Sequence, residues 1–208
     1  MKQKFYLFFA FILFVSAAKS QENQTRFGVT AGLSIANWNI KASGISIGTQ
    51  SVTGFTGGVI AFMPLSSNIS LQTGLNYVQK GTKVDDGGGD VEIAKLNYIE
   101  LPLNIVYTHE GFHVGVGPTI AMGLSGTEKS TSQGTTETSD VTFGSGDNDV
   151  ARFDIGANLT AAYVLPNGFM LSANYNFGLS NLQPNSSSSD GKVTNRYFGI
   201  RIGYLFNK

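Results

Sequence analysis

The charged side chains that could do chemistry in this sequence are few. Glu100, Asp154, Arg152 and Arg201 all share the polar side of alternating segments. A pair of carboxylates can act as general acid and base in a hydrolytic site. Opposite charges can instead form ion pairs that offset the cost of burying each other. Because nothing near these residues resembles an activated nucleophile, we expect a structural polar network of Glu100, Asp154, Arg152 and Arg201, and no catalytic residue.

Histidine and aspartate offer the other chances for chemistry. His109 and His113 lack a serine motif of the nucleophile-elbow kind that a histidine base would serve. Oxygen ligands for Ca²⁺ are grouped in two places, but neither group has the ligand spacing of an EF-hand. These groups are Asp85, Asp86 and Asp90, and Asp147 with Asp149. The glycine run 87–89 lacks the Lys and Ser/Thr of a phosphate loop. We therefore expect no enzyme, no cofactor and no metal site.

The composition gives limits on partners and redox chemistry. Among 208 residues, Lys+Arg and Asp+Glu balance at 14 each, and charged residues make up only 13%. This balance predicts no nucleic-acid partner. The sequence has no cysteine, which excludes disulfides and thiolate chemistry.

The first 20 residues have the pattern of a signal peptide. Lys2 and Lys4 precede an apolar run over 5–15, and small residues follow up to Ser20. The competing reading is a membrane anchor, but the run is shorter than the roughly 20 apolar residues that a spanning helix needs. We expect export, cleavage near Ser20, and one mature domain over 21–208.

Period-two alternation of apolar and small or polar residues recurs along the mature chain and predicts strands. Eight segments show it: 26–37, 54–65, 69–80, 98–107, 112–122, 152–165, 169–179 and 197–206. Short connections at 66–68, 108–111 and 166–168 alternate with long ones at 41–53, 82–90, 126–148 and 183–191. Short turns at one end and long loops at the other are typical of an outer-membrane barrel. An even strand number then places both chain termini in the periplasm.

The residues of the two faces separate a membrane barrel from a soluble one. A lipocalin-like carrier would turn its polar face to water, where Lys and Glu are common. Here the polar face is mostly Gly, Ser, Thr, Asn and Gln, which suits the narrow interior of eight strands. We therefore predict an all-β fold, an eight-stranded antiparallel up-and-down transmembrane β-barrel.

Aromatic residues on the apolar face fall at two levels, as girdles at the two membrane interfaces would. The periplasmic-side girdle comprises Phe27, Tyr107, Phe112, Tyr163, Phe169 and Phe206. The outer girdle comprises Phe55, Tyr77, Phe153, Phe177 and Phe198.

Several motifs resemble the PorT-type family of outer-membrane β-barrel proteins of diderm (Gram-negative) bacteria. They are FGVTAGLS at 27–34, LQTGLNYVQKG at 71–81, YIELPL at 98–103, VGP at 116–118 and GYLF at 203–206. The resemblance covers the mature chain and implies an OmpX-like eight-stranded barrel in the outer membrane, without a reaction. One departure is that Asn207 and Lys208 follow Phe206, so the terminal residue is not aromatic.

The function that we expect is that of a non-catalytic, monomeric outer-membrane barrel. Polar side chains would plug its lumen, and its long outer loops would serve adhesion or recognition. Its partners would be outer-membrane lipids and other envelope proteins. A small pore, or an accessory of an outer-membrane secretion or transport system, is the first alternative. A soluble lipocalin-like carrier is the second.

Overall fold

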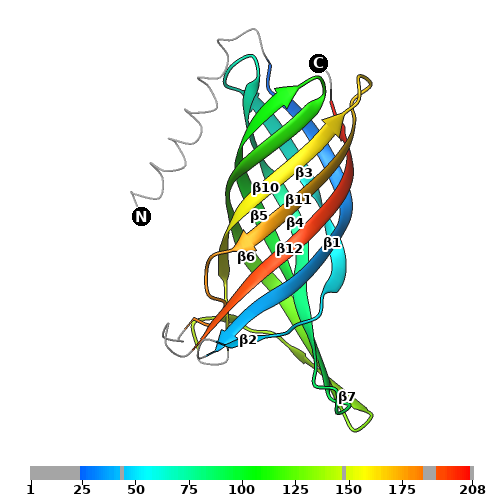
Figure 1. Ribbon diagram of the computed structural model, residues 1–208, viewed down its shortest axis with the longest axis vertical. Coiled ribbons are helices and arrows are strands. Elements are labelled where there is room, and N and C mark those ends of the chain that lie inside the picture. The colour runs from blue at the N-terminus through cyan, green and yellow to red at the C-terminus, as the bar shows by residue number, and fades with distance from the viewer. Residues whose placement is uncertain (1–23, 43–44, 147–148, 185–190, 207–208) are drawn as a thin grey trace.

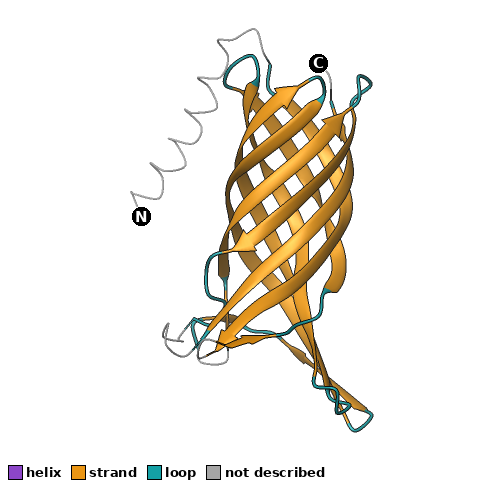
Figure 2. Cartoon of the chain, viewed as in Figure 1, coloured by secondary structure: helices purple, strands orange, loops and turns teal. Residues whose placement is uncertain are grey.

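The computed structural model describes residues 24–42, 45–146, 149–184 and 191–206, and they are built almost entirely from β-strands (Figures 1 and 2). Eight antiparallel strands form a closed ring, because β6 pairs with β10 and β12 pairs with β1. In ring order these are β1 (Arg26–Ala42), β3 (Val52–Pro64), β4 (Ile69–Asp85), β5 (Val91–His109), β6 (Phe112–Ser132), β10 (Phe153–Val164), β11 (Phe169–Gly178) and β12 (Lys192–Leu205). The predicted fold class is confirmed.

Four short strands lie outside this ring. β2 (Ile45–Ile47) pairs with β1, and β7 (Thr135–Asp140) pairs with the far end of β6. β8 (Phe143–Gly144) and β9 (Val150–Ala151) form a small parallel pair. Figure 1 shows the β6–β7 hairpin extending well beyond the barrel at its long-loop end.

Five strands extend well beyond the segments that the alternation predicts. β1 continues to Ala42, β4 to Asp85 and β6 to Ser132, while β5 begins at Val91 and β12 at Lys192. The expected loops at 82–90 and 126–148 are therefore partly wrong, since the beginning of the first and most of the second are strand. Where a strand extends beyond its alternating segment, both of its faces can be polar. The hydrogen bonds between neighbouring backbones continue there, although the period-two pattern has ended.

The opposite end of the barrel is closed by tight turns. Glu110 and Gly111 have φ angles of 47° and 84° between β5 and β6, and positive φ at both central residues is what a type I′ hairpin turn requires. The Phe206 N–H donates to the Phe27 carbonyl at 2.7 Å, so the first and last strands end together at this short-turn end (Figure 1).

Two sequence expectations fall on residues that the structure does not describe. The predicted signal peptide, residues 1–20, and Asp147 both lie outside the described ranges. Within those ranges, none of the chain forms a helix that is long and apolar enough to cross a membrane.

Candidate functional site

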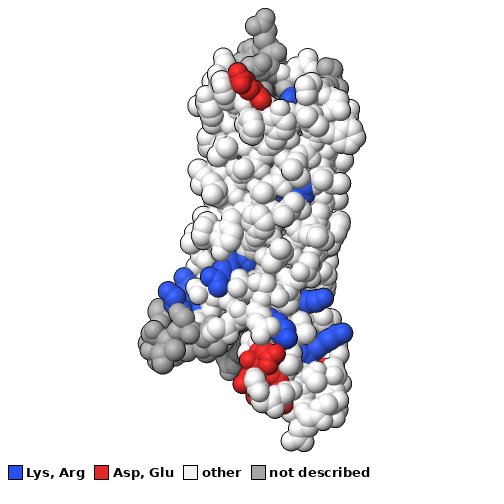
Figure 3. Space-filling model, turned by 45° about the vertical axis from the view of Figure 1, so that its right-hand side comes forward, with Lys and Arg blue, Asp and Glu red and all other residues white. Residues whose placement is uncertain are grey.

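The two faces of the barrel wall differ sharply in their exposure. Along each strand, apolar side chains point outward and remain exposed, as with Phe112 at 60% and Ile202 at 69%. The alternate residues point into the lumen and are buried. On the face shown in Figure 3, Lys, Arg, Asp and Glu gather mainly toward the long-loop end, and the middle of the wall is largely free of them. The interior is thus the place where buried polar groups could form a site.

An ionic triad lies at the centre of this interior. The Lys80 ammonium is 3.1 Å from Glu100 Oε2 and 3.0 Å from Asp154 Oδ2. All three side chains are at most 2% exposed. Lys80 comes from β4, Glu100 from β5 and Asp154 from β10, so the triad joins strands that are not all neighbours in the ring.

Hydrogen bonds satisfy the carboxylates further. The Tyr197 hydroxyl donates to Glu100 Oε1 at 2.5 Å, and Asn195 Nδ2 donates to Asp154 Oδ2 at 3.0 Å. Ser180 Oγ donates to Asp154 Oδ1 at 3.1 Å. A carboxylate held by a buried cation and by several donors is fixed in place and shielded from water, which suits a structural role better than a general base.

Lys80 was not included in the network predicted from sequence. The signal was available, because Lys80 lies on the same strand face as Gln72 and Asn76, the face that turns inward. A lysine on an inward face needs a counter-charge. Both predicted carboxylates, Glu100 and Asp154, are in fact its partners.

The two predicted arginines are not part of this triad. Arg152 is exposed in the bend before β10, where it donates to the Phe143 carbonyl at 2.8 Å. Its assignment to the luminal network is therefore corrected, because the alternating strand begins only at Phe153. Arg201 does point inward, but the group that it contacts is Asn174 Oδ1.

Arg201 begins a chain of amide hydrogen bonds across the lumen. Asn174 Nδ2 donates to Asn158 Oδ1 at 3.2 Å, and Asn158 Nδ2 donates to Asn104 Oδ1 at 3.3 Å. Asn104 Nδ2 in turn donates to Gln72 Oε1 at 3.2 Å. This polar layer ties β12, β11, β10, β5 and β4 together, and buried polar groups joined in this way rigidify an interior.

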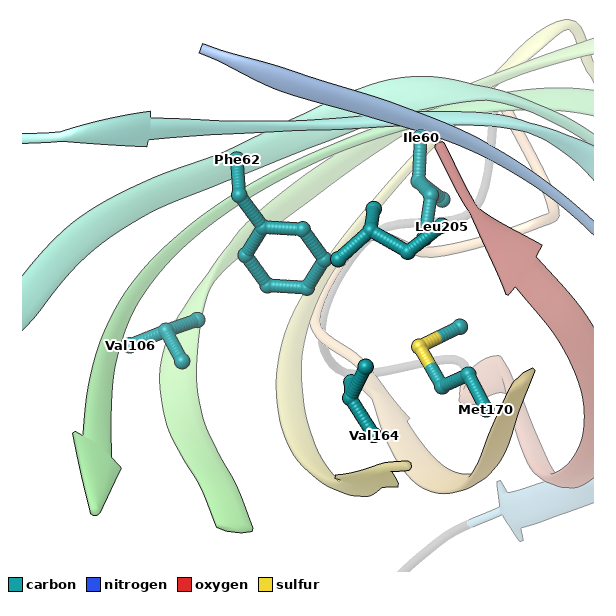
Figure 4. Packing of buried hydrophobic residues seen from close by; sticks show 6 residues of the cluster. All are labelled: Ile60, Phe62, Val106, Val164, Met170 and Leu205. Atoms are coloured by element: carbon teal, nitrogen blue, oxygen red, sulfur yellow. The ribbon is translucent and has the colours of Figure 1, made fainter. Parts of the chain in front are cut away.

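Apolar layers close the lumen on both sides of these polar groups. Toward the short-turn end, six side chains converge inside the barrel, as Figure 4 shows: Ile60, Phe62, Val106, Val164, Met170 and Leu205. Toward the long-loop end, Phe143 packs on Tyr98 with ring centroids 5.7 Å apart, together with Leu96 and Ala121. The plug is therefore only partly polar, which corrects the expectation of polar side chains alone.

Little free space remains between the layers. A cavity of about 20 Å³ lies among Thr30, Asn76, Asn104 and Arg201, which is room for about one water molecule. Thr30 Oγ1 and Asn76 Oδ1 have no hydrogen-bond partner in the described protein, so such a water would have polar atoms to bind. This cavity is too small for a larger substrate, and a larger hollow of about 420 Å³ lies at the short-turn mouth, where His113 and Val164 are among the lining residues.

Among the described residues, the histidines and the loop aspartates do not come together in a second polar site. His113 Nδ1 is 2.9 Å from Thr108 Oγ1, and its ring lies against Phe62. His109 is exposed in the turn region. In the β4–β5 turn, the Gly87 N–H and Lys83 lower the pKa of Asp85. Among the residues described, no three His, Cys, Asp or Glu side chains gather as metal ligands would.

Three solved structures illustrate what this chain is similar to. Ail, the attachment invasion locus protein of Yersinia pestis, is 13% identical over 88% of this chain and 100% of that chain, with a TM-score of 0.50. Neisserial surface protein A is also 13% identical, over 88% and 100%, with a TM-score of 0.46. The outer membrane protease OmpT of Escherichia coli is 11% identical, over 91% and 100%, with a TM-score of 0.38.

These likenesses concern architecture only. At 13% identity the match to Ail shows the fold alone, and the two lower scores carry no argument. A search of curated proteins found no match. Residues 17–183 match the family described as "Outer membrane protein beta-barrel domain". These residues span most of the sequence, and the chain therefore belongs to the outer membrane protein beta-barrel domain family.

Proposed function

We propose that this outer-membrane barrel is a non-catalytic, monomeric protein that holds its long outer hairpins at the cell surface for adhesion or recognition. The observation that carries the proposal is the closed interior. Two apolar layers enclose an ionic triad and an asparagine layer, and the cavity between these layers has a volume of about 20 Å³. A barrel without a usable lumen can act only through its outer surface and its loops.

Two bands of exposed aromatic residues support the position of the barrel in the bilayer. Toward the short-turn end the outward aromatic side chains are Phe27, Tyr107, Phe112, Tyr163, Phe169 and Phe206. Toward the long-loop end they are Phe55, Phe153, Phe177 and Phe198, all exposed, and the half-buried Tyr77. We assign these bands to the two membrane interfaces, where aromatic girdles of such barrels lie.

The orientation follows from the usual layout of these proteins. Bacterial outer-membrane barrels have short periplasmic turns and longer extracellular loops. The short turns and the ends of β1 and β12 lie together (Figure 1). We therefore assign this end, and with it both chain termini, to the periplasm.

The outer end carries the surface for recognition. β4, β5, β6 and β7 are neighbours in one sheet, and they continue past the barrel as a projecting arm (Figure 1). The side chains of β7 are all exposed and polar. Lipids and other envelope proteins are the partners that such an arm and barrel wall would meet.

The alternatives gain less support. The PorT-type motifs favour a close relationship to that family. A small pore, or an accessory of an outer-membrane secretion or transport system, is the second candidate. Catalysis would need an accessible nucleophile, whereas Glu100 and Asp154 are buried against Lys80. A soluble carrier would leave with the periplasmic fraction, whereas our proposal predicts that the protein stays with the outer membrane.

The adhesion proposal can be tested by shortening the arm. Residues 127–140 would be replaced by an Asn-Gly turn, which joins two adjacent antiparallel strands. Bacteria expressing this variant should adhere less to immobilised glycans and matrix proteins, while the barrel stays folded by heat-modifiable gel mobility. Replacing the turn residues 86–90 by the same turn is the control. Unchanged adhesion after removal of the arm would contradict the proposal.

A further inference from the structure

A hollow of about 260 Å³ lies on the outward face of the paired strands β5 and β6, near their long-loop end. It is lined by Ile93, Lys95, Thr127 and Lys129. In the strand register Lys95 pairs with Thr127 and Ile93 pairs with Lys129. The two lysines are therefore diagonal neighbours, about 7–8 Å apart at the backbone. Their long, flexible stems allow both ammonium groups to converge on one anion.

Neither lysine has a counter-charge in the described part of the chain. Lys80, Lys83 and His109 form ion pairs among the described residues, whereas neither Lys95 nor Lys129 has a carboxylate within 4.0 Å there. Asp140 on β7 is the register partner of Thr127, yet it forms no ion pair with either lysine. Lys83, which is opposite Ile93 on β4, is instead paired with Asp85 at 3.3 Å.

The position of the hollow relative to the lipid-facing wall identifies its environment. Leu124 on β6, 47% exposed, is the last large apolar side chain of the outward wall on this strand, and it lies beside Ser125, the register partner of Asn97 on β5. Lys95 lies two residues beyond Asn97, about 7 Å along the strand. With the strand tilt of about 40° usual in such barrels, this places it about 5 Å beyond the edge of the apolar wall. That is the level of lipid headgroups, which cover about 5–7 Å on each side of the hydrocarbon core.

We propose that Lys95 and Lys129, with Ile93 and Thr127, bind the phosphate of a lipid headgroup whose acyl chains lie against the outward wall below. Charge-assisted hydrogen bonds from two ammonium groups would hold the phosphate. The apolar surface of the hollow and its continuity with the lipid-facing wall favour a lipid over a free anion. That the lipid belongs to the outer leaflet rests on the proposed orientation of the barrel.

The chain offers a matched control at the same end of the barrel. Lys41 and Lys192 are exposed register partners across β1 and β12. Removing these two charges changes the net charge as much as removing Lys95 and Lys129 does. It leaves the hollow intact.

The test measures lipid binding to the full-length folded protein in neutral detergent by native mass spectrometry. The probes are dioctanoyl phosphatidic acid, dioctanoyl phosphatidylcholine and sodium phosphate. The double variant Lys95→Gln, Lys129→Gln should bind phosphatidic acid roughly 10- to 30-fold more weakly than the unmodified protein. The variant Lys41→Gln, Lys192→Gln should keep the binding, and heat-modifiable mobility verifies that both variants are folded.

Two results would overturn the proposal. Equal losses in both double variants would mean diffuse electrostatic attraction at the rim without a site. Binding of sodium phosphate as tight as that of phosphatidic acid would mean that the lipid is not recognised. Because these measurements use detergent, they do not depend on orientation, which is tested by protease cleavage of a site inserted at 86–90 in intact cells.

Discussion

The Lys80 ammonium and the Asp154 carboxylate lie 3.0 Å apart, although 74 residues separate them in the sequence. Their strands, β4 and β10, are not neighbours, since β5 and β6 lie between them in the ring. The ion pair therefore crosses the lumen. Together with the contact between Lys80 and Glu100, it links opposite sides of the barrel through the lumen. The backbone hydrogen bonds alone connect only neighbouring strands.

Replacing Lys80 by methionine should destabilise the barrel strongly. The change leaves Glu100 and Asp154 buried without their cation, and removing one partner of a buried pair costs about 3–5 kcal/mol. Urea unfolding of the refolded protein in detergent measures the loss. Adding Glu100→Gln and Asp154→Asn should recover much of it, since the remaining groups are then neutral. A Lys80→Met variant as stable as the unmodified protein would contradict a structural role for the triad.

Replacing Phe143 by alanine should open the mouth of the lumen at the long-loop end. Phe143 packs on Tyr98 and belongs to the cluster against which Trp38 lies. Loss of a buried phenyl ring costs about 3–5 kcal/mol. Trp38 is the single tryptophan of the chain, so its fluorescence should become more accessible to acrylamide. Unchanged quenching would show that Phe143 does not cover this mouth.

Gly117 should not tolerate a methyl group. A Cβ at this position would lie 2.0 Å from the backbone carbonyl oxygen of Leu103 on the neighbouring strand. Gly117→Ala should lower the free energy of unfolding by about 1–3 kcal/mol, the usual cost of overpacking. Gly48→Ala is the control, because its Cβ would meet no atom within 4 Å. Equal stabilities of the two variants would show that the strands can separate to make room.

The outward face should be in contact with lipid. Val116 is 59% exposed on β6, whereas Trp38 packs against the interior cluster. In a Trp38→Phe background, a tryptophan introduced by Val116→Trp should be quenched strongly by brominated lipids in reconstituted bilayers. The native Trp38 should be quenched weakly under the same conditions. The reverse order would mean that the assignment of the two faces is inverted.

The sequence predicts the barrel well because period-two alternation is a local property. In β5, for example, Leu101 and Leu103 point outward while Glu100 and Pro102 point inward, as alternation requires. Alternation does not predict the faces of a strand where residues on both faces are apolar. Ile60 and Phe62 blur it in β3 because they are apolar residues on the inward face, where they help to close the short-turn end.

The partners within the interior could be predicted only in part. Alternation places Lys80, Glu100 and Asp154 on inward faces, but contact also depends on strand register and on strands facing each other across the lumen. Neither the register nor the pairing across the lumen can be determined from the residues of a single strand. Arg152 was wrongly placed in the lumen. The period-two pattern includes it, but it lies in a bend before the strand begins.

The most direct test of the closed barrel is the conductance of the purified, refolded protein in a planar lipid bilayer. The cavity between the layers has a volume of about 20 Å³, so we expect a quiet bilayer without steady current steps. Heat-modifiable mobility of the same sample verifies that the inserted protein is folded. Steady, reproducible openings from the unmodified protein would contradict the closed lumen and favour a pore.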